Sequence, residues 1–118
     1  MTAALRACGA KVVASYVLAG GILSGKYASG AGGRMAGEVD APQWQAAVRA
    51  AAELKALAAE LDTAPAVLAM AFALANPEVA TILFGATRPE QVRENVAAAD
   101  VVGTLTESQL ERLRAIGV

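Results

Sequence analysis

Two short apolar runs, separated by a long stretch of helical pattern, most constrain the fold of this chain. Val12 to Leu18 is rich in β-branched residues, and Ala80 to Phe84 is a second run of this kind, so each predicts a short buried strand. A helical crossover between two strands favours a parallel, right-handed unit. Because parallel sheets are normally covered on both faces, we expect this chain to be a piece of a larger α/β fold.

Start and stop signals predict helices at about residues 42–61, 64–75, 88–98 and 107–116. Asp40 is the expected N-cap of the first helix, with Pro42 in its first turn. Thr63-Ala-Pro65 starts the second, which is apolar all round and ends at Asn76-Pro77.

Capping-box patterns mark the other two helices, at Thr87 with Glu90 and at Thr106 with Gln109. Residues 2–8 read as the tail of a further helix, closed by Gly9. Residues 20–37 are glycine-dense and predict a long loop that holds one short turn at most. Loops of that length are usually functional or mobile.

Composition excludes several classes of function. The net charge is −1 and no dense basic run occurs, which argues against nucleic-acid binding. The chain has no histidine and one cysteine, Cys8, so a disulfide, a cysteine-based metal site, a zinc–histidine site and a Ser-His-Asp triad are excluded within it. Cys8 is expected to be a buried or tolerated thiol. No metal site is expected.

Apolar segments bear on location and on partners. The start of the chain lacks the long apolar core of a signal peptide, and the longest apolar run, Ala66 to Ala75, is well short of the roughly 20 residues that span a bilayer. A cytoplasmic location is expected. Much of the 56% apolar content is alanine, which buries little area, and some apolar surface is expected to meet neighbours outside this chain.

The turn after the second predicted strand has the features of an anion site. Gly85 allows close approach of a ligand, Thr87 can cap the helix or donate its hydroxyl, and Arg88 can grip a phosphate. A helix N-terminus also favours negative charge. Polar residues on the first helical face follow, and they suit a ribose or an adenine edge: Gln91, Glu94 and Asn95. The alternative is an ordinary capped turn with a solvated helix face.

Two spaced motifs carry a family resemblance. Residues 15–27 read SYVLAGGILSGKY and residues 85–95 read GATRPEQVREN. Together with the intervening pattern they resemble the C-terminal part of the aldo-keto reductase family, particularly its bacterial members and the potassium-channel β-subunits. The resemblance implies a (β/α)8 TIM barrel that binds NADP(H) at the carboxyl ends of its strands. Residues 1–118 would be a partial domain that holds strands seven and eight and lacks the N-terminal strands.

The resemblance also implies positions for the cofactor. Tyr16, Leu18 and Gly20 would lie near the pyrophosphate, with Lys26 just beyond and Arg34 in the glycine-dense segment as a phosphate-side arginine. The residues implied at the adenosine end are Gly85, Thr87 and Arg88 at the 2′-phosphate, and Gln91, Glu94 and Asn95 around the adenine and ribose. As alternatives, Lys26 and Arg34 are solvated loop charges and Tyr16 is a core residue, while Trp44 is expected to be a packing residue.

The chain departs from the family pattern at two places. The Ser-Pro-Leu of the family is Tyr16-Val17-Leu18 here, and Ser15 stands where an aromatic residue often stacks on nicotinamide, so the adenosine end matches more closely than the nicotinamide end. The family's catalytic Asp, Tyr, Lys and His belong to earlier strands. No catalytic residue is therefore assigned within this chain.

Three interpretations of function follow. The first is a C-terminal fragment of an NADP(H)-dependent oxidoreductase, from a truncated or split gene, inactive by itself and with weak or no NADPH affinity. The second is a non-catalytic NADP(H)-binding module, or a chain that completes a barrel with an N-terminal partner. The third is a self-associating piece whose exposed strand edges pair between copies.

Overall fold

A two-stranded parallel sheet forms one side of the molecule. The computed structural model describes residues 1–30, 32–33 and 35–116. Strand β1 (Val12–Ala14) pairs with β2 (Val79–Ile82), with Val13 opposite Thr81 and Ala14 opposite Ile82. The prediction of two parallel strands joined by a helical crossover is confirmed.

Both strands are shorter or shifted relative to the prediction. β1 ends at Ala14 rather than at Leu18, because Tyr16 has a φ of 61° and Ala19 a φ of 48°, which is left-handed backbone that cannot continue a strand. β2 begins at Val79 and ends at Ile82 rather than spanning residues 80–84. Leu83 still donates its N–H to the Ala14 carbonyl at 2.8 Å. Beyond that bond the chain that follows β1 turns away from β2 and offers it no further backbone hydrogen-bond partner among the described residues.

The helices follow the predicted order. Helix α1 spans Thr2–Cys8, α2 Gln45–Glu60, α3 Pro65–Leu74, α4 Pro89–Val96, α5 Ala98–Val101 and α6 Glu107–Ile116. Four 3-10 turns complete the described elements: η1 Ala19–Ser24, η2 Lys26–Ser29, η3 Pro42–Trp44 and η4 Val102–Thr104. The helix expected at 88–98 is divided, since α4 ends at Val96 and α5 starts two residues later.

Proline decides where three of these helical segments begin. η3, α3 and α4 each begin at a proline, and the residue before it has extended backbone and serves as the N-cap: Ala41, Ala64 and Arg88. A proline ring disfavours helical geometry in the preceding residue and is tolerated at the first helical position. The predicted N-cap at Asp40 is therefore wrong by one residue.

Capping boxes gave one correct and one incorrect prediction. Thr106 and Gln109 exchange the expected bonds, at 2.8 Å and 3.3 Å. The Thr87–Glu90 box is wrong, because Gln91 Oε1 accepts the N–H groups of Thr87 at 2.8 Å and Arg88 at 3.2 Å. At the other end of the chain, Gly9 closes α1 with a φ of 64°, as expected.

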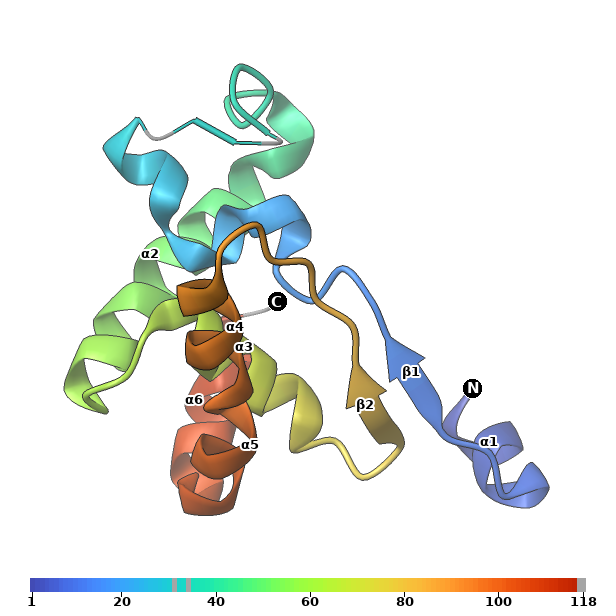
Figure 1. The fold of residues 1–118 in the computed structure, drawn as a ribbon. Coiled ribbons are helices and arrows are strands. Elements are labelled where there is room, and N and C mark those ends of the chain that lie inside the picture. Colours follow the sequence, from blue (N-terminus) through green and yellow to red (C-terminus); the bar gives the residue numbers. More distant parts are fainter. Residues whose placement is uncertain (31, 34, 117–118) are drawn as a thin grey trace.

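The core lies among the helices rather than on the sheet. One cluster joins α2, α3 and α6 through Leu54, Leu57, Ala58, Leu68, Ala69 and Leu113. A second joins α3 to α5 through Ala66, Val67, Met70, Ala71 and Ala98, with Ile82 of β2 packed against it. Figure 1 shows α3 to α6 gathered beside β2, with β1 on the outer side. α3 is buried at six positions, as its apolar pattern predicts.

The opposite face of the sheet is open to solvent. Val13 and Leu83 are 56% and 58% exposed, and Thr81 between them is exposed as well. Large aliphatic side chains on a strand are normally covered. The expectation that apolar surface is left for neighbours outside this chain is consistent with this open face.

The glycine-dense segment is more ordered than a long loop with one turn. It holds two 3-10 turns, η1 and η2, and its Ile22 and Met35 are buried against Ala51 of α2. Trp44 packs against the same cluster, which confirms its predicted packing role. Its Nε1 is buried without a hydrogen-bond partner in the described part of the chain.

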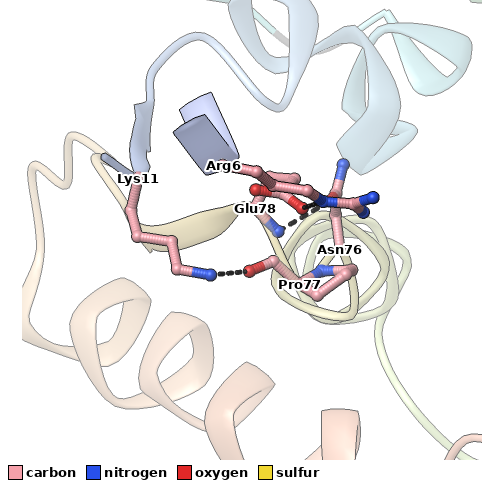
Figure 2. A network of polar contacts seen from close by, with 5 residues as sticks. All are labelled: Arg6, Lys11, Asn76, Pro77 and Glu78. Carbon is pink, nitrogen blue, oxygen red and sulfur yellow. Dashed lines mark hydrogen bonds and ion pairs between the residues drawn. The ribbon is translucent and has the colours of Figure 1, made fainter. Parts of the chain in front are cut away.

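Polar contacts hold α1 at the amino ends of the strands (Figure 2). Arg6 Nε donates to Glu78 Oε1 at 2.7 Å, and Lys11 Nζ donates to the Pro77 carbonyl at 2.6 Å. Asn76 Oδ1 accepts the Glu78 N–H at 3.0 Å. No residue of α1 is buried, so the Arg6–Glu78 contact, rather than apolar packing, ties the helix to the start of β2.

The molecule is slightly extended as a result. Its Cα radius of gyration is 14.5 Å, against roughly 13.5 Å for a globular chain of this length, and α1 projects beyond the sheet in Figure 1. Cys8, at the end of α1, is exposed rather than buried. Among the described residues no single helix is long and apolar enough to span a membrane; one pair, Pro42–Glu60 with Pro65–Leu74, meets the length and composition test jointly but is bent by 94°.

Candidate functional site

A pocket of about 520 Å³ lies at the carboxyl ends of the two strands. Four segments form its walls: the turn after β1, the start of α3, the segment after β2, and α4. The lining residues are Tyr16, Val17, Leu18, Gly20, Gly21, Ser24, Lys26, Pro65, Ala66, Leu83, Phe84, Gly85, Arg88, Gln91, Glu94 and Asn95. The volume suits a small organic ligand, and the carboxyl ends of parallel strands are where α/β folds place their sites.

The pocket brings together most of the residues that the sequence singled out. Those that line it are Tyr16, Leu18, Gly20, Lys26, Gly85, Arg88, Gln91, Glu94 and Asn95. Thr87 does not line it. Thr87 borders a shallow depression with Arg88 and Arg93 on the other side of the turn, and Arg34 lies outside the described residues.

Strained backbone marks the wall that follows β1. Tyr16 adopts a φ of 61°, a conformation that costs a residue with a Cβ roughly 1–2 kcal/mol. Its side chain is 53% exposed, so the alternative that Tyr16 is a core residue is wrong. Such strain concentrates at binding sites, where the surrounding structure enforces it.

The two predicted site glycines differ in what the fold requires of them. Gly20 has a φ of 68°, and a Cβ there would lie 2.9 Å from the Tyr16 hydroxyl and 2.9 Å from Met35 Cγ. Gly20 is therefore required by the protein's own packing. A Cβ on Gly85 would meet no atom within 4 Å, so the protein's own packing does not require glycine at this position of the pocket lining.

Two cations and one carboxylate face this space. Lys26 and Arg88 line the pocket, and neither forms an ion pair with a described residue. Lys26 Nζ lies 4.9 Å from the centre of the Tyr27 ring, a cation–π contact that leaves its charge uncancelled. Glu94 is the carboxylate, so the net charge of the lining side chains is positive.

The polar residues of α4 fall into two groups. Gln91 already uses its Oε1 to cap the helix, where it accepts three bonds from Thr87 and Arg88. Asn95 is 8% exposed and lines the pocket, so its amide can contact a ligand held there.

Two helices direct their first turns at the pocket. Pro65 and Ala66 open α3, and Arg88 and Gln91 open α4. Unpaired N–H groups and the helix dipole make both termini attractive to anions. The charge and shape of the arrangement suit a negatively charged, partly apolar ligand.

Sequence reasoning missed several lining residues. Gly21 and Ser24 lie inside the GGILSGK motif, between the predicted site residues Gly20 and Lys26. Their position between these two residues was the sequence signal that could have identified them. Pro65 and Ala66 belong to a helix start far from either motif, and Leu83 and Phe84 were assigned to a buried strand. The sequence at the start of an apolar helix does not reveal that it lines a pocket, because only the tertiary fold brings the start of α3 to the strand ends.

Comparison with known proteins agrees with these features. The family model for the aldo/keto reductase family matches residues 1–118. A protein of Schizosaccharomyces pombe that carries the name of a voltage-gated potassium channel subunit beta is 33% identical over 105 residues, covering 81% of this chain and 30% of that protein.

Two plant proteins match to a similar degree. Proteins of Oryza sativa subsp. japonica and Arabidopsis thaliana, each named a probable voltage-gated potassium channel subunit beta, are both 36% identical over 107 residues. Each alignment covers 84% of this chain and 33% of the relative. The chain thus spans about a third of the length of these relatives. With a family model that matches all 118 residues, this chain belongs to the aldo/keto reductase family.

Proposed function

We propose that residues 1–118 form the part of an NADP(H)-dependent carbonyl reductase that binds the phosphates and adenosine of the cofactor. In this proposal β1 and β2 are neighbouring strands of a (β/α)8 barrel, and the strands that complete it lie outside these residues. The family membership and the parallel β–α–β unit support this assignment.

One observation carries the proposal. Two segments far apart in the sequence, the turn after β1 and the turn after β2, line one pocket and contribute one cation each, Lys26 and Arg88. A dinucleotide with several phosphates needs this pairing of cations with helix N-termini. An ordinary capped turn would not require two separated segments to converge.

The residues present fit such a cofactor. Arg88 and the start of α4 suit the 2′-phosphate, the open space at Gly85 allows a phosphate to approach the backbone, and the buried amide of Asn95 suits the polar edge of the ribose or adenine. Lys26 suits the pyrophosphate. When bound, the nicotinamide supplies the hydride for reduction of a carbonyl.

Chemistry at the carbonyl requires groups from outside these residues. Tyr16 and Lys26 line the pocket, but no general acid or base pair forms among the described lining residues. We therefore propose that the isolated chain does not reduce carbonyl compounds, and that it binds NADPH weakly because most of the walls of the site are supplied elsewhere.

The open sheet supports a second candidate role, completion of a barrel or association with another copy. Val13 and Leu83 are exposed on one face, and within the described residues each strand pairs with one neighbour. Unpaired strand edges readily accept another strand. Light scattering of the chain distinguishes the possibilities, because a monodisperse monomer argues against self-association.

The cofactor proposal is tested by NMR titration of the 118-residue chain with NADPH and with NADH. We expect NADPH to shift the amide signals of Gly85, Arg88 and Asn95 at millimolar concentration, and NADH, which lacks the 2′-phosphate, to act more weakly. Arg88→Ala should weaken NADPH binding by about tenfold, the value of one charged hydrogen bond.

Arg49→Ala is the matched control, because Arg49 is an exposed arginine on α2 away from the pocket. Shifts spread over the whole chain, or equal losses in both arginine variants, would contradict a specific site. An NADPH oxidation assay with aromatic aldehydes completes the test. Turnover above background would show that the chain carries catalytic groups of its own.

A further inference from the structure

The Tyr27 hydroxyl joins the two ends of the glycine-dense segment. It accepts the backbone N–H of Met35 at 2.9 Å and lies 3.3 Å from the Gly20 carbonyl, to which it donates. Gly20 lines the pocket and Met35 is buried beneath it. Tyr27 itself does not line the pocket, so its hydroxyl connects a pocket wall to the core without facing a ligand.

The Tyr27 ring supports the ammonium of Lys26. Lys26 Nζ lies 4.9 Å from the ring centre, and nearby glycines leave room for this pair. A Cβ on Gly33 would come within 2.7 Å of both Lys26 Nζ and the Tyr27 hydroxyl, and one on Gly21 would come within 3.0 Å of Lys26 Cε. A side chain at Gly33 would therefore displace this pair, so the backbone beside it, as well as the ring, bounds the position of Lys26.

An exposed lysine normally samples many rotamers, and fixing it on binding costs conformational entropy. A lysine already resting on an aromatic ring loses less when a ligand arrives. Lys26 is the pocket cation contributed by the β1 side, whereas Arg88 comes from the β2 side. The location of this ammonium therefore decides where along the pocket a second anionic group is held.

We propose that Tyr27 is a positioning residue, which holds the Lys26 ammonium at the pocket through its ring and locks the glycine-dense segment through its hydroxyl. The anionic group that Lys26 meets is the pyrophosphate of a dinucleotide, and this part of the inference rests on the function proposed above. Tyr27 acts through Lys26 and Gly20 and makes no contact with the ligand.

The positioning itself is tested without a ligand, by NMR of the full chain and its Tyr27→Leu and Tyr27→Phe variants. In the parent the Lys26 side-chain protons should be shifted upfield by the ring below them, and the Met35 amide should exchange slowly with solvent. In Tyr27→Leu, which removes the ring, we expect the Lys26 signals to move toward those of an exposed lysine. In Tyr27→Phe, which keeps the ring and removes the hydroxyl, the Met35 amide should exchange about fivefold faster, the equivalent of one lost hydrogen bond.

Thr104→Val is the matched control. It also removes a hydroxyl that donates to a backbone carbonyl, that of Val101 at 2.8 Å, but it lies away from the pocket. Both Lys26 and Met35 signals should be unchanged in it. If Tyr27→Leu keeps the Lys26 shift, or Tyr27→Phe keeps the slow Met35 exchange, the proposal is overturned.

A ligand comparison then separates positioning from general loosening of the fold. 2′-AMP carries the phosphate assigned to Arg88, and 2′-phospho-ADP-ribose adds the pyrophosphate assigned to Lys26. Tyr27→Leu should weaken binding of 2′-phospho-ADP-ribose by about fivefold and leave 2′-AMP unchanged. Equal weakening of both ligands would indicate a structural role only. If the parent binds neither, the proposed function fails, while the ligand-free measurements still decide the role of Tyr27.

Discussion

The two ends of the sheet use their polar side chains in opposite ways. At the amino ends, Arg6 pairs with the buried carboxylate of Glu78, and Lys11 is bound to the Pro77 carbonyl (Figure 2). At the carboxyl ends, Lys26 and Arg88 line the pocket and form no ion pair with any described residue, and Asn95 lines the pocket with them.

This difference indicates which end serves stability and which is available to a ligand. Polar groups that are paired within the chain hold it together, whereas the exposed charges of Lys26 and Arg88 around an open space are free to meet a ligand. In barrels of the (β/α)8 type the same division places function at the carboxyl face and stability at the amino face.

The largest expected effect on stability comes from the ion pair at the amino ends of the two strands. Arg6→Ala should lower the free energy of unfolding by about 2 kcal/mol, because the Glu78 side chain, 10% exposed, then loses the partner of its hydrogen bond and ion pair. Urea denaturation measures the loss. Arg88→Ala is the control at the carboxyl end and should change stability by less than about 0.5 kcal/mol. Equal losses from the two variants would remove the distinction between the ends.

A smaller effect tests the strain at the carboxyl end. Ala19 has a φ of 48° and does not line the pocket, so Ala19→Gly should raise the free energy of unfolding by about 0.5–1 kcal/mol, since relief of left-handed strain exceeds the extra entropy of the unfolded chain. Thermal denaturation measures it.

Asp62→Gly provides the comparison. Asp62 also has a positive φ, 50°, but it lies after α2 and aspartate tolerates this backbone better than alanine. Its gain should be smaller. A larger gain at Asp62 than at Ala19 would contradict the view that strain is concentrated beside the pocket.

The smallest expected effect on stability concerns the surface ion pair between α2 and α6, which lies at neither end of the sheet. Arg112 donates to both carboxylate oxygens of Glu60, at 2.9 Å and 3.0 Å, and this hydrogen bonding lowers the pKa of Glu60 from its ordinary value of 4.5. A carboxylate whose pKa is lower in the folded state contributes stability above its unfolded pKa, and that contribution is lost as the pH falls through the folded pKa.

Glu60→Gln should therefore be slightly less stable than the parent at pH 7, and the difference should vanish at acid pH. The pair is exposed, so the effect is small and weakens further in salt. Denaturation curves at a series of pH values measure it. A difference that grows on acidification would contradict the sign of this linkage.

Local chemistry made the helices predictable. Proline at a first helical position set the starts at Pro42, Pro65 and Pro89, Gly9 closed α1, and the Thr106–Gln109 box formed as the residues implied. Each of these depends on neighbours within a few residues, so the sequence contains all that is needed. The candidate site was predictable where motif residues lie next to strand ends, as Gly85 and Arg88 do.

Longer-range features were not predictable in the same way. β1 stops at Ala14 because Tyr16 is held in left-handed backbone by its surroundings. The salt bridge from Arg6 to Glu78 and the contribution of Pro65 and Ala66 to the pocket join segments far apart in sequence.

The sequence by itself determined the element order, the parallel crossover, the family and most of the residues around the pocket. Only the tertiary structure decided which polar groups are satisfied internally and which remain free, because hydrogen bonding and burial depend on partners that periodicity and propensity do not identify. That is why Lys26, which the sequence left open between a solvated charge and a ligand contact, acquired a defined place on Tyr27 at the pocket wall.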